Sequence, residues 1–81
     1  MPKLPVVSGK KIIKMLTQLN YKVMRQKGSH VRLEKSTKLG KHKITIPNHK
    51  EIAKGTLNDI LSKVSLWNSI PREKLIKLLK K

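Results

Sequence analysis

Apolar residues recur with a helical period near both ends of the chain and alternate with polar residues in its middle. The N-terminal apolar stripe comprises Ile12, Ile13, Leu16 and Leu19. Ser8 precedes this stripe and can cap a helix, because its hydroxyl accepts a hydrogen bond from an early backbone amide. Asn20 follows the stripe and tolerates the left-handed backbone that often ends a helix. The pattern predicts a helix over about residues 9–19.

Three predicted strands follow this helix, at residues 21–26, 30–34 and 42–47. The second alternates between polar and apolar side chains, and the third presents Thr45 to the face opposite Ile44 and Ile46. Pro47 has no amide hydrogen to donate to a ladder, so we expect it to end the third strand. A polar loop that contains Gly40 joins the second strand to the third.

The connection between the first two strands allows two registers. A two-residue turn at residues 27–28 would place the polar Lys22 opposite Leu33. A three-residue loop over residues 26–28 would place Tyr21 opposite Leu33 and would match apolar with apolar side chains. The second register also puts the loop glycine where a left-handed residue is needed, so we predict that one.

The second half of the chain is helical again. Residues 56–59 fit the capping-box pattern, which predicts that a helix begins there. The apolar stripe of this helix comprises Leu57, Ile60, Leu61 and Val64. A break over residues 68–71 precedes a short final helix. The order α-β-β-β-α plus one helix predicts an α+β two-layer sandwich, in which helices cover one face of a three-stranded antiparallel sheet.

Charge points to a polyanionic partner. The 81 residues include 20 Lys and Arg against 4 Asp and Glu, a formal net charge of +16. Self-repulsion of this size opposes a compact fold and is relieved by a bound polyanion. Basic residues run along the whole chain and do not gather in one amphipathic segment, which favours nucleic acid over an anionic membrane.

Other classes of site lack their residues. No cysteine is present, so disulfides and thiolate zinc sites are excluded. The four carboxylates are scattered, and no two histidines have ligand spacing on one element, so we expect no metal. The short chain favours a shallow site without an organic cofactor. No apolar run resembles a signal peptide or a membrane span, which predicts a cytoplasmic protein with no membrane partner.

The scarcity of aromatic residues narrows the mode of nucleic-acid recognition. The chain has no Phe, one Trp and one Tyr, and Tyr21 suits the core better than the surface. Stacking of splayed bases on an aromatic platform is therefore disfavoured. Recognition through backbone charge and helical shape is favoured, as in modules that bind double-stranded RNA.

His30 is the candidate for chemistry. On the alternating second strand, His30 and Arg32 point to the face of the sheet that the helices leave open. The preferred register sets Arg25 opposite Ser29, so three cations, Lys27 included, lie near the imidazole. Histidine titrates near neutrality and can move a proton on or off a ribose hydroxyl or a leaving 5′-oxygen. From the residues alone, a polar side chain on a solvated strand face is the simpler interpretation.

His49 is a second candidate. Pairing of the second and third strands about Gly40 sets His30 opposite Pro47, so His49 falls just past that edge of the sheet. Two histidines at one phosphate can divide acid and base duties between them. A phosphate contact or a loop cap is the simpler role for His49. His42 lies at the far end of the hairpin, and we assign it no catalytic role.

Several motifs in order resemble one known family. They are Ser8-Gly9-Lys10, Arg25-Gln26-Lys27-Gly28-Ser29-His30, Ile46-Pro47-Asn48-His49, and Lys54-Gly55-Thr56-Leu57 leading into Ile60-Leu61. In these motifs the chain is similar to the HicA toxins, small mRNA interferases that a HicB antitoxin neutralises. The resemblance covers about residues 1–66, which we expect to form one RNA-binding ribonuclease domain. Residues 67–81 are then a C-terminal helical extension packed on the same domain.

The resemblance implies a fold like that of double-stranded RNA-binding domains and a metal-independent endoribonuclease that needs no cofactor. The histidine of its Gly-Ser-His motif, here His30, would be catalytic, and His49 matches a histidine of less settled role. The expected RNA contacts around His30 are Arg25, Lys27, Gly28, Ser29 and Arg32. The implied partners are mRNA and a HicB-like antitoxin. The family commonly has Gly where Asn20 stands, and Asn can replace it sterically.

Two other functions fit the same composition. A non-catalytic RNA-binding module would use the same basic surface without cleaving. A structural protein of the ribosome or nucleoid would bind RNA and DNA alike, with steep dependence on salt.

Overall fold

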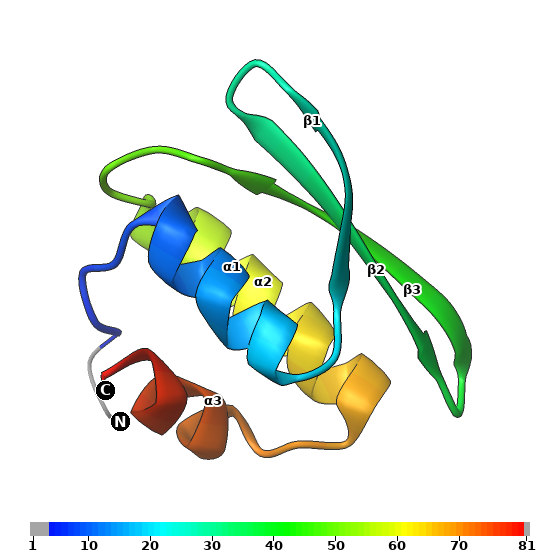
Figure 1. Cartoon of the computed structure of the whole chain (residues 1–81). Coiled ribbons are helices and arrows are strands. Elements are labelled where there is room, and N and C mark those ends of the chain that lie inside the picture. Colours follow the sequence, from blue (N-terminus) through cyan, green and yellow to red (C-terminus); the bar gives the residue numbers. More distant parts are fainter. Residues whose placement is uncertain (1–3, 81) are drawn as a thin grey trace.

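The computed structural model describes residues 4–80 as a three-stranded sheet with helices on one face (Figure 1). The elements are α1 (Gly9–Gln18), β1 (Lys22–Lys27), β2 (His30–Thr37), β3 (Gly40–Pro47), α2 (Lys54–Asn68) and α3 (Arg72–Leu79). The strands lie in the order β1-β2-β3, and both neighbouring pairs are antiparallel. This architecture confirms the predicted α+β fold, similar to that of double-stranded RNA-binding domains.

The helix starts follow different local signals. Ser8 caps α1 as predicted, since its hydroxyl accepts a hydrogen bond from the Lys11 amide at 3.1 Å. The prediction that the next helix begins at a capping box was wrong, because α2 begins at Lys54 without a side-chain cap. The preceding Ile52 is buried, and its amide donates to the Val7 carbonyl at 2.8 Å. That anchor fixes the chain just ahead of the helix, and the first turn forms upstream of Thr56.

The connection between β1 and β2 differs from both registers considered above. Lys27 pairs with His30, so the turn consists of Gly28 and Ser29. Gly28 has φ +60°, and a left-handed glycine at the first turn position matches the twist of a two-residue hairpin. The backbone conformation that the turn requires therefore determines the register at this end of the hairpin, and the matching of apolar side chains does not.

A β-bulge at Met24 shifts the rest of β1 by one residue. Val23 pairs with Leu33, whereas Arg25 pairs with Arg32. Leu33 therefore faces Val23, and not Tyr21 as predicted, and Val23 is 50% exposed. All six residues of β1 are exposed, as on an edge strand that the helices do not cover. Tyr21 just before β1 is buried, as predicted.

One hydrophobic core joins the helices to the inner face of the sheet. Its fully buried side chains include Ile12, Met15, Leu16, Leu33, Ile46, Leu57, Leu61, Val64 and Leu75. The apolar stripes predicted for α1 and α2 supply most of these. α3 packs against both α1 and α2 and contributes Leu75, Ile76 and Leu79 to the same core.

α2 continues past residue 66 and ends at Asn68, where Ser69 adopts a left-handed backbone with φ 54°. The division of the chain into residues 1–66 and 67–81 therefore stays a prediction, with α2 crossing the expected boundary. No helix within residues 4–80 combines the length and the apolar character that a membrane crossing requires.

Candidate functional site

The open face of the sheet carries a shallow depression beside the β1–β2 turn. Arg25, Lys27, His30, Arg32 and Thr45 line it. Four of these residues were predicted to lie together, and the structure brings them together. The motif residues Gly28 and Ser29 form the turn next to the depression and do not line it.

Strand pairing explains why these side chains converge. Lys27 lies opposite His30 and Arg25 lies opposite Arg32. Side chains of directly opposed residues share a face of the sheet, so all four project from the side that the helices leave uncovered. The prediction that Arg25 faces Ser29 was wrong: Arg25 pairs with Arg32, and both line the depression.

Thr45 was not assigned to the site from the sequence, although the information was there. The predicted pairing of His30 with Pro47 is confirmed, and it places Arg32 opposite Thr45. Thr45 was already predicted to point outward. The two statements together place Thr45 beside Arg32 on the open face, where it lines the depression.

The charged side chains that line the depression are all positive. Its lining contains two arginines, one lysine and an exposed imidazole, and it contains no carboxylate. Cations arranged in this way attract a phosphodiester and offset charge that develops on its oxygens. The imidazole of His30 can exchange a proton with a group held there. Among residues 4–80, no group of three His, Cys, Asp or Glu side chains is placed to hold a metal ion.

The segment after β3 holds the start of α1 beside this end of the sheet. The Gly9 amide donates to the His49 carbonyl at 2.9 Å, and the Asn48 amide donates to the Ser29 carbonyl at 2.6 Å. His49 is thus tied by its backbone near the β1–β2 turn, and its side chain is exposed. It does not line the depression with His30. Its part in any chemistry stays a prediction.

His42 has a different environment from the other two histidines. It is buried on β3, and its Nδ1 lies 2.6 Å from the Tyr21 hydroxyl. Its ring stacks on Trp67 with centroids 4.8 Å apart. Burial lowers the pKa of His42, and the charge of Lys63 lowers it further. These contacts give His42 a role in packing.

Comparison with curated proteins and with solved structures yields no match. A protein-family model described as the HicA toxin of bacterial toxin–antitoxin systems matches residues 9–66. The match runs from the first residue of α1 to the last turns of α2 and includes the depression around His30. The chain therefore belongs to the HicA toxin family and is a toxin of a toxin–antitoxin system.

Proposed function

We propose that this toxin is an endoribonuclease that cleaves mRNA without a metal ion, with His30 as its general acid or base. One observation carries the proposal: the exposed imidazole of His30 shares a depression with Arg25, Lys27 and Arg32. A proton-transfer group surrounded by cations is what the cleavage of a phosphodiester by a neighbouring hydroxyl requires.

The reaction that fits this site uses the ribose itself as the nucleophile. The 2′-oxygen attacks the adjacent phosphorus as its proton passes to a base, and the bond from phosphorus to the 5′-oxygen breaks. The leaving 5′-oxygen takes up a proton. The products are a 2′,3′-cyclic phosphate and a free 5′-hydroxyl. His30 serves one of these two proton transfers, while the arginines and Lys27 stabilise the charge on the phosphoryl oxygens.

The test compares the wild-type chain with a His30→Ala variant on a labelled mRNA in the presence of EDTA. General acid–base catalysis contributes about 10²–10⁴-fold, so we expect cleavage by the variant to fall by at least about 10²-fold. RNA affinity should be retained, because the three cations remain. Equal cleavage by both proteins would contradict the proposal.

Two additions make this test sharper. A His49→Ala variant purified in the same way reports whether the second histidine takes part in proton transfer. Analysis of the product ends distinguishes a 2′,3′-cyclic phosphate from a 5′-phosphate, which a water nucleophile would leave. If neither the wild type nor the variants cleave and all bind RNA, the non-catalytic module is the better description.

The cognate antitoxin is the second part of the proposal. We infer that a HicB-like partner presents an acidic surface and covers His30, because the toxin carries a net charge of +16 and its reactive side chain is exposed. Addition of equimolar antitoxin should abolish both cleavage and RNA binding. An antitoxin that binds and leaves cleavage intact would contradict this.

A further inference from the structure

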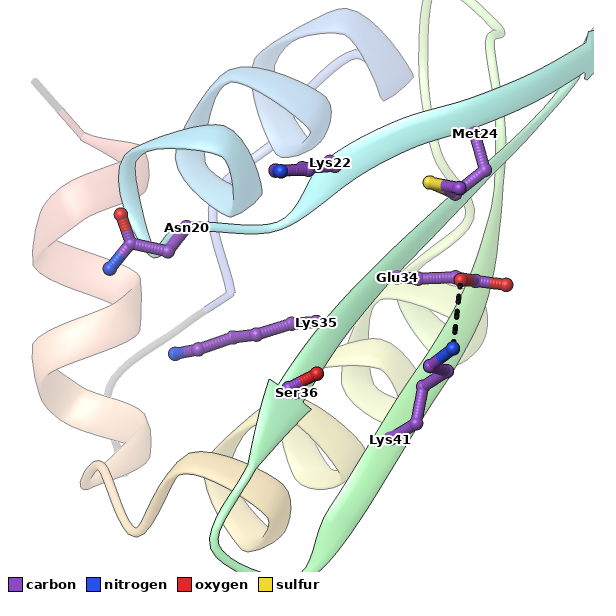
Figure 2. Close-up of a pocket in the computed structure, with 7 residues that line it drawn as sticks. All are labelled: Asn20, Lys22, Met24, Glu34, Lys35, Ser36 and Lys41. Atoms are coloured by element: carbon purple, nitrogen blue, oxygen red, sulfur yellow. Dashed lines mark ion pairs between the residues drawn. The ribbon is translucent and has the colours of Figure 1, made fainter.

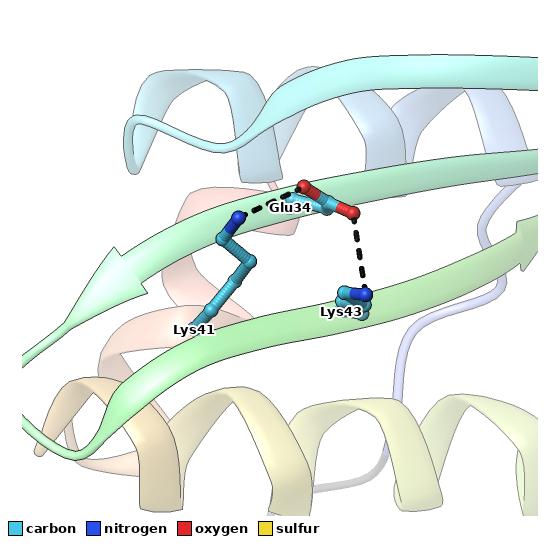
Figure 3. Close-up of polar contacts among 3 residues, drawn as sticks. All are labelled: Glu34, Lys41 and Lys43. Atoms are coloured by element: carbon cyan, nitrogen blue, oxygen red, sulfur yellow. Dashed lines mark ion pairs between the residues drawn. The ribbon is translucent and has the colours of Figure 1, made fainter.

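A second group of lysines lies on the open face of the sheet, further along β2 from His30. Lys41 and Lys43 each place their Nζ atom 4.0 Å from a different carboxylate oxygen of Glu34 (Figure 3). Lys43 also faces Glu34 across the β2–β3 ladder, and Lys22 faces it across the β1–β2 ladder. We call Lys22, Lys41 and Lys43 the second lysine cluster.

Glu34 does not neutralise the second lysine cluster. Its carboxylate lies 4.0 Å from the amines of Lys41 and Lys43, and exposed ion pairs at this separation are weak, so the two lysine charges exceed the single charge of Glu34. The side chains of Lys41 and Lys43 are 59% and 60% exposed, whereas that of Glu34 is 19% exposed. The amines therefore stand above the carboxylate and meet solvent first.

The surface beside the second lysine cluster is hollowed. Lys22, Met24, Glu34 and Lys41 contribute to the walls of a depression, and Lys41 reaches toward Glu34 within it (Figure 2). Both strands that flank β2 supply a lysine to this depression. A ligand lying here would meet positive charge from both sides of the strand.

β2 connects this depression to the one around His30. His30, Arg32 and Glu34 are alternate residues of the strand and so lie on one face of the sheet. At a rise of about 3.3 Å per residue, Glu34 lies roughly 13 Å along the strand from His30. The two aromatic side chains of the protein are occupied elsewhere, since Tyr21 is buried and Trp67 stacks on His42. This face therefore offers cations for phosphates and no Tyr or Trp ring on which bases could stack.

We propose that the second lysine cluster binds another phosphate of the same RNA strand whose scissile phosphate lies at His30. The RNA backbone then runs along the open face of β2, from Arg32 toward Glu34. The placement of the scissile phosphate at His30 rests on the proposed function. The second lysine cluster adds a phosphate-binding site that is distinct from the reactive site.

The other route from His30 is over α1, which presents exposed Lys10 and Lys14. Those lysines line a separate hollow whose wall includes Ile13. The segment of residues 47–49 intervenes, hydrogen-bonded to Ser29 on one side and to the start of α1 on the other. A strand taking this route would have to cross that segment, whereas the route along β2 is a continuous strand face.

The experiment measures binding of a fluorescein-labelled single-stranded oligoribonucleotide at several salt concentrations. Every protein carries His30→Ala, so that the RNA stays intact. Loss of one phosphate contact to a single strand should reduce the slope of log K against log salt by about 0.7. We expect this reduction, with weaker binding, for the Lys41→Ala/Lys43→Ala pair of substitutions.

Two matched pairs control for the loss of charge. Lys74→Ala/Lys77→Ala removes the same charge from exposed positions on α3, and Lys10→Ala/Lys14→Ala removes it from α1. Both should leave the slope near that of the parent. Equal reductions in all three variants would mean a diffuse electrostatic effect, and a reduction for the α1 pair alone would mean that RNA leaves over α1. Either result overturns the proposal.

Glu34→Gln supplies a test of opposite sign. Removing the carboxylate should tighten RNA binding, because Lys41 and Lys43 lose a competing anion and keep their positions on the sheet. Unchanged or weaker binding by a variant with wild-type thermal stability would contradict the second site. These binding measurements do not depend on cleavage. A wild-type protein that does not cleave RNA would refute the proposed function, and the salt slopes would still show whether the second site binds phosphate.

Discussion

Gly9 shows how much one residue can determine about the placement of the site. A Cβ atom at this position would lie 2.0 Å from the Pro47 carbonyl oxygen and 2.9 Å from the Asn48 Cα atom. Both neighbours are backbone, so neither can rotate away. The absence of a side chain therefore lets the start of α1 close onto the segment that runs beside the β1–β2 turn.

Replacement of Gly9 by Ala should be destabilising. The added methyl group must push α1 away from residues 47–48, and overpacking of this kind costs about 1–3 kcal/mol. Chemical denaturation measures the change in the free energy of unfolding. Gly55→Ala is the matched control, because Gly55 is exposed on α2 and a Cβ atom there would have no neighbour within 4 Å. We expect this substitution to raise the free energy of unfolding by ~0.5–1 kcal/mol. A Gly9→Ala protein as stable as wild type would contradict the close contact.

Single residues were predictable from the sequence when their role is local. The cap at Ser8 depends on its near neighbours, and Gly28 marks a turn because of its own backbone. Gly9 was part of a motif, but the sequence did not show why a glycine is needed there, because its close neighbours Pro47 and Asn48 are distant in sequence. Thr45 could have been assigned to the site by combining the register of β2 and β3 with the alternation of β3.

At the scale of elements, the helices and strands that bury one face were predictable from the sequence. α1, α2 and the pair β2–β3 each bury a regular stripe, and their period is visible in the residues. β1 has no such stripe, because it is an edge strand exposed along its whole length. Its register depends on the turn and on the bulge at Met24, and neither is a matter of hydrophobic matching.

One polar network ties the ends of three elements together. The Asn68 side-chain amide donates to the Tyr21 hydroxyl at 2.9 Å, so that hydroxyl is free to donate to Nδ1 of His42 at 2.6 Å. Tyr21 leads into β1, His42 belongs to β3 and Asn68 ends α2. With Nδ1 unprotonated, a neutral His42 accepts this hydrogen bond, and the lowered pKa of His42 favours the neutral form. Cations surround it, since Lys35 faces it across the ladder and Lys63 lies on α2.

Acid should therefore destabilise the fold through His42. Burial first, and then the charge of Lys63, hold its pKa below the ordinary value of 6.5. The unfolded chain takes up this proton first, so the stabilisation is complete above pH 6.5 and is lost as the pH falls through the lowered pKa. Thermal unfolding from neutral to mildly acid pH measures the effect. A His42→Gln variant should be less stable at neutral pH and should lose this part of the pH dependence, and an unchanged profile would contradict the assignment.

At the scale of the whole molecule, charge is the dominant feature. Twenty basic residues face four acidic ones, so few ammonium groups can find a carboxylate within the protein. They are spread over a molecule with extents of 31 × 30 × 21 Å. The sequence predicted a polyanionic partner from this imbalance. It did not predict how the cations divide among surfaces, because that depends on the hairpin register and on which face the helices cover.

Salt should act in opposite directions on stability and on RNA binding. Screening shortens the Debye length from about 10 Å at 0.1 M to about 3 Å at 1 M, so repulsion among the lysines falls and the unfolding temperature should rise with salt. RNA affinity should fall over the same range, because counterions released into more concentrated salt gain less entropy. A Lys10→Glu variant tests whether repulsion between positive charges causes the salt effect on stability. The substitution lowers the net charge and adds an acidic residue to the first turn of α1, which has none. It should raise the unfolding temperature at low salt and make that temperature depend less on salt. An unfolding temperature that falls with salt in both proteins would mean that attraction, and not repulsion, dominates the charge interactions of the free toxin.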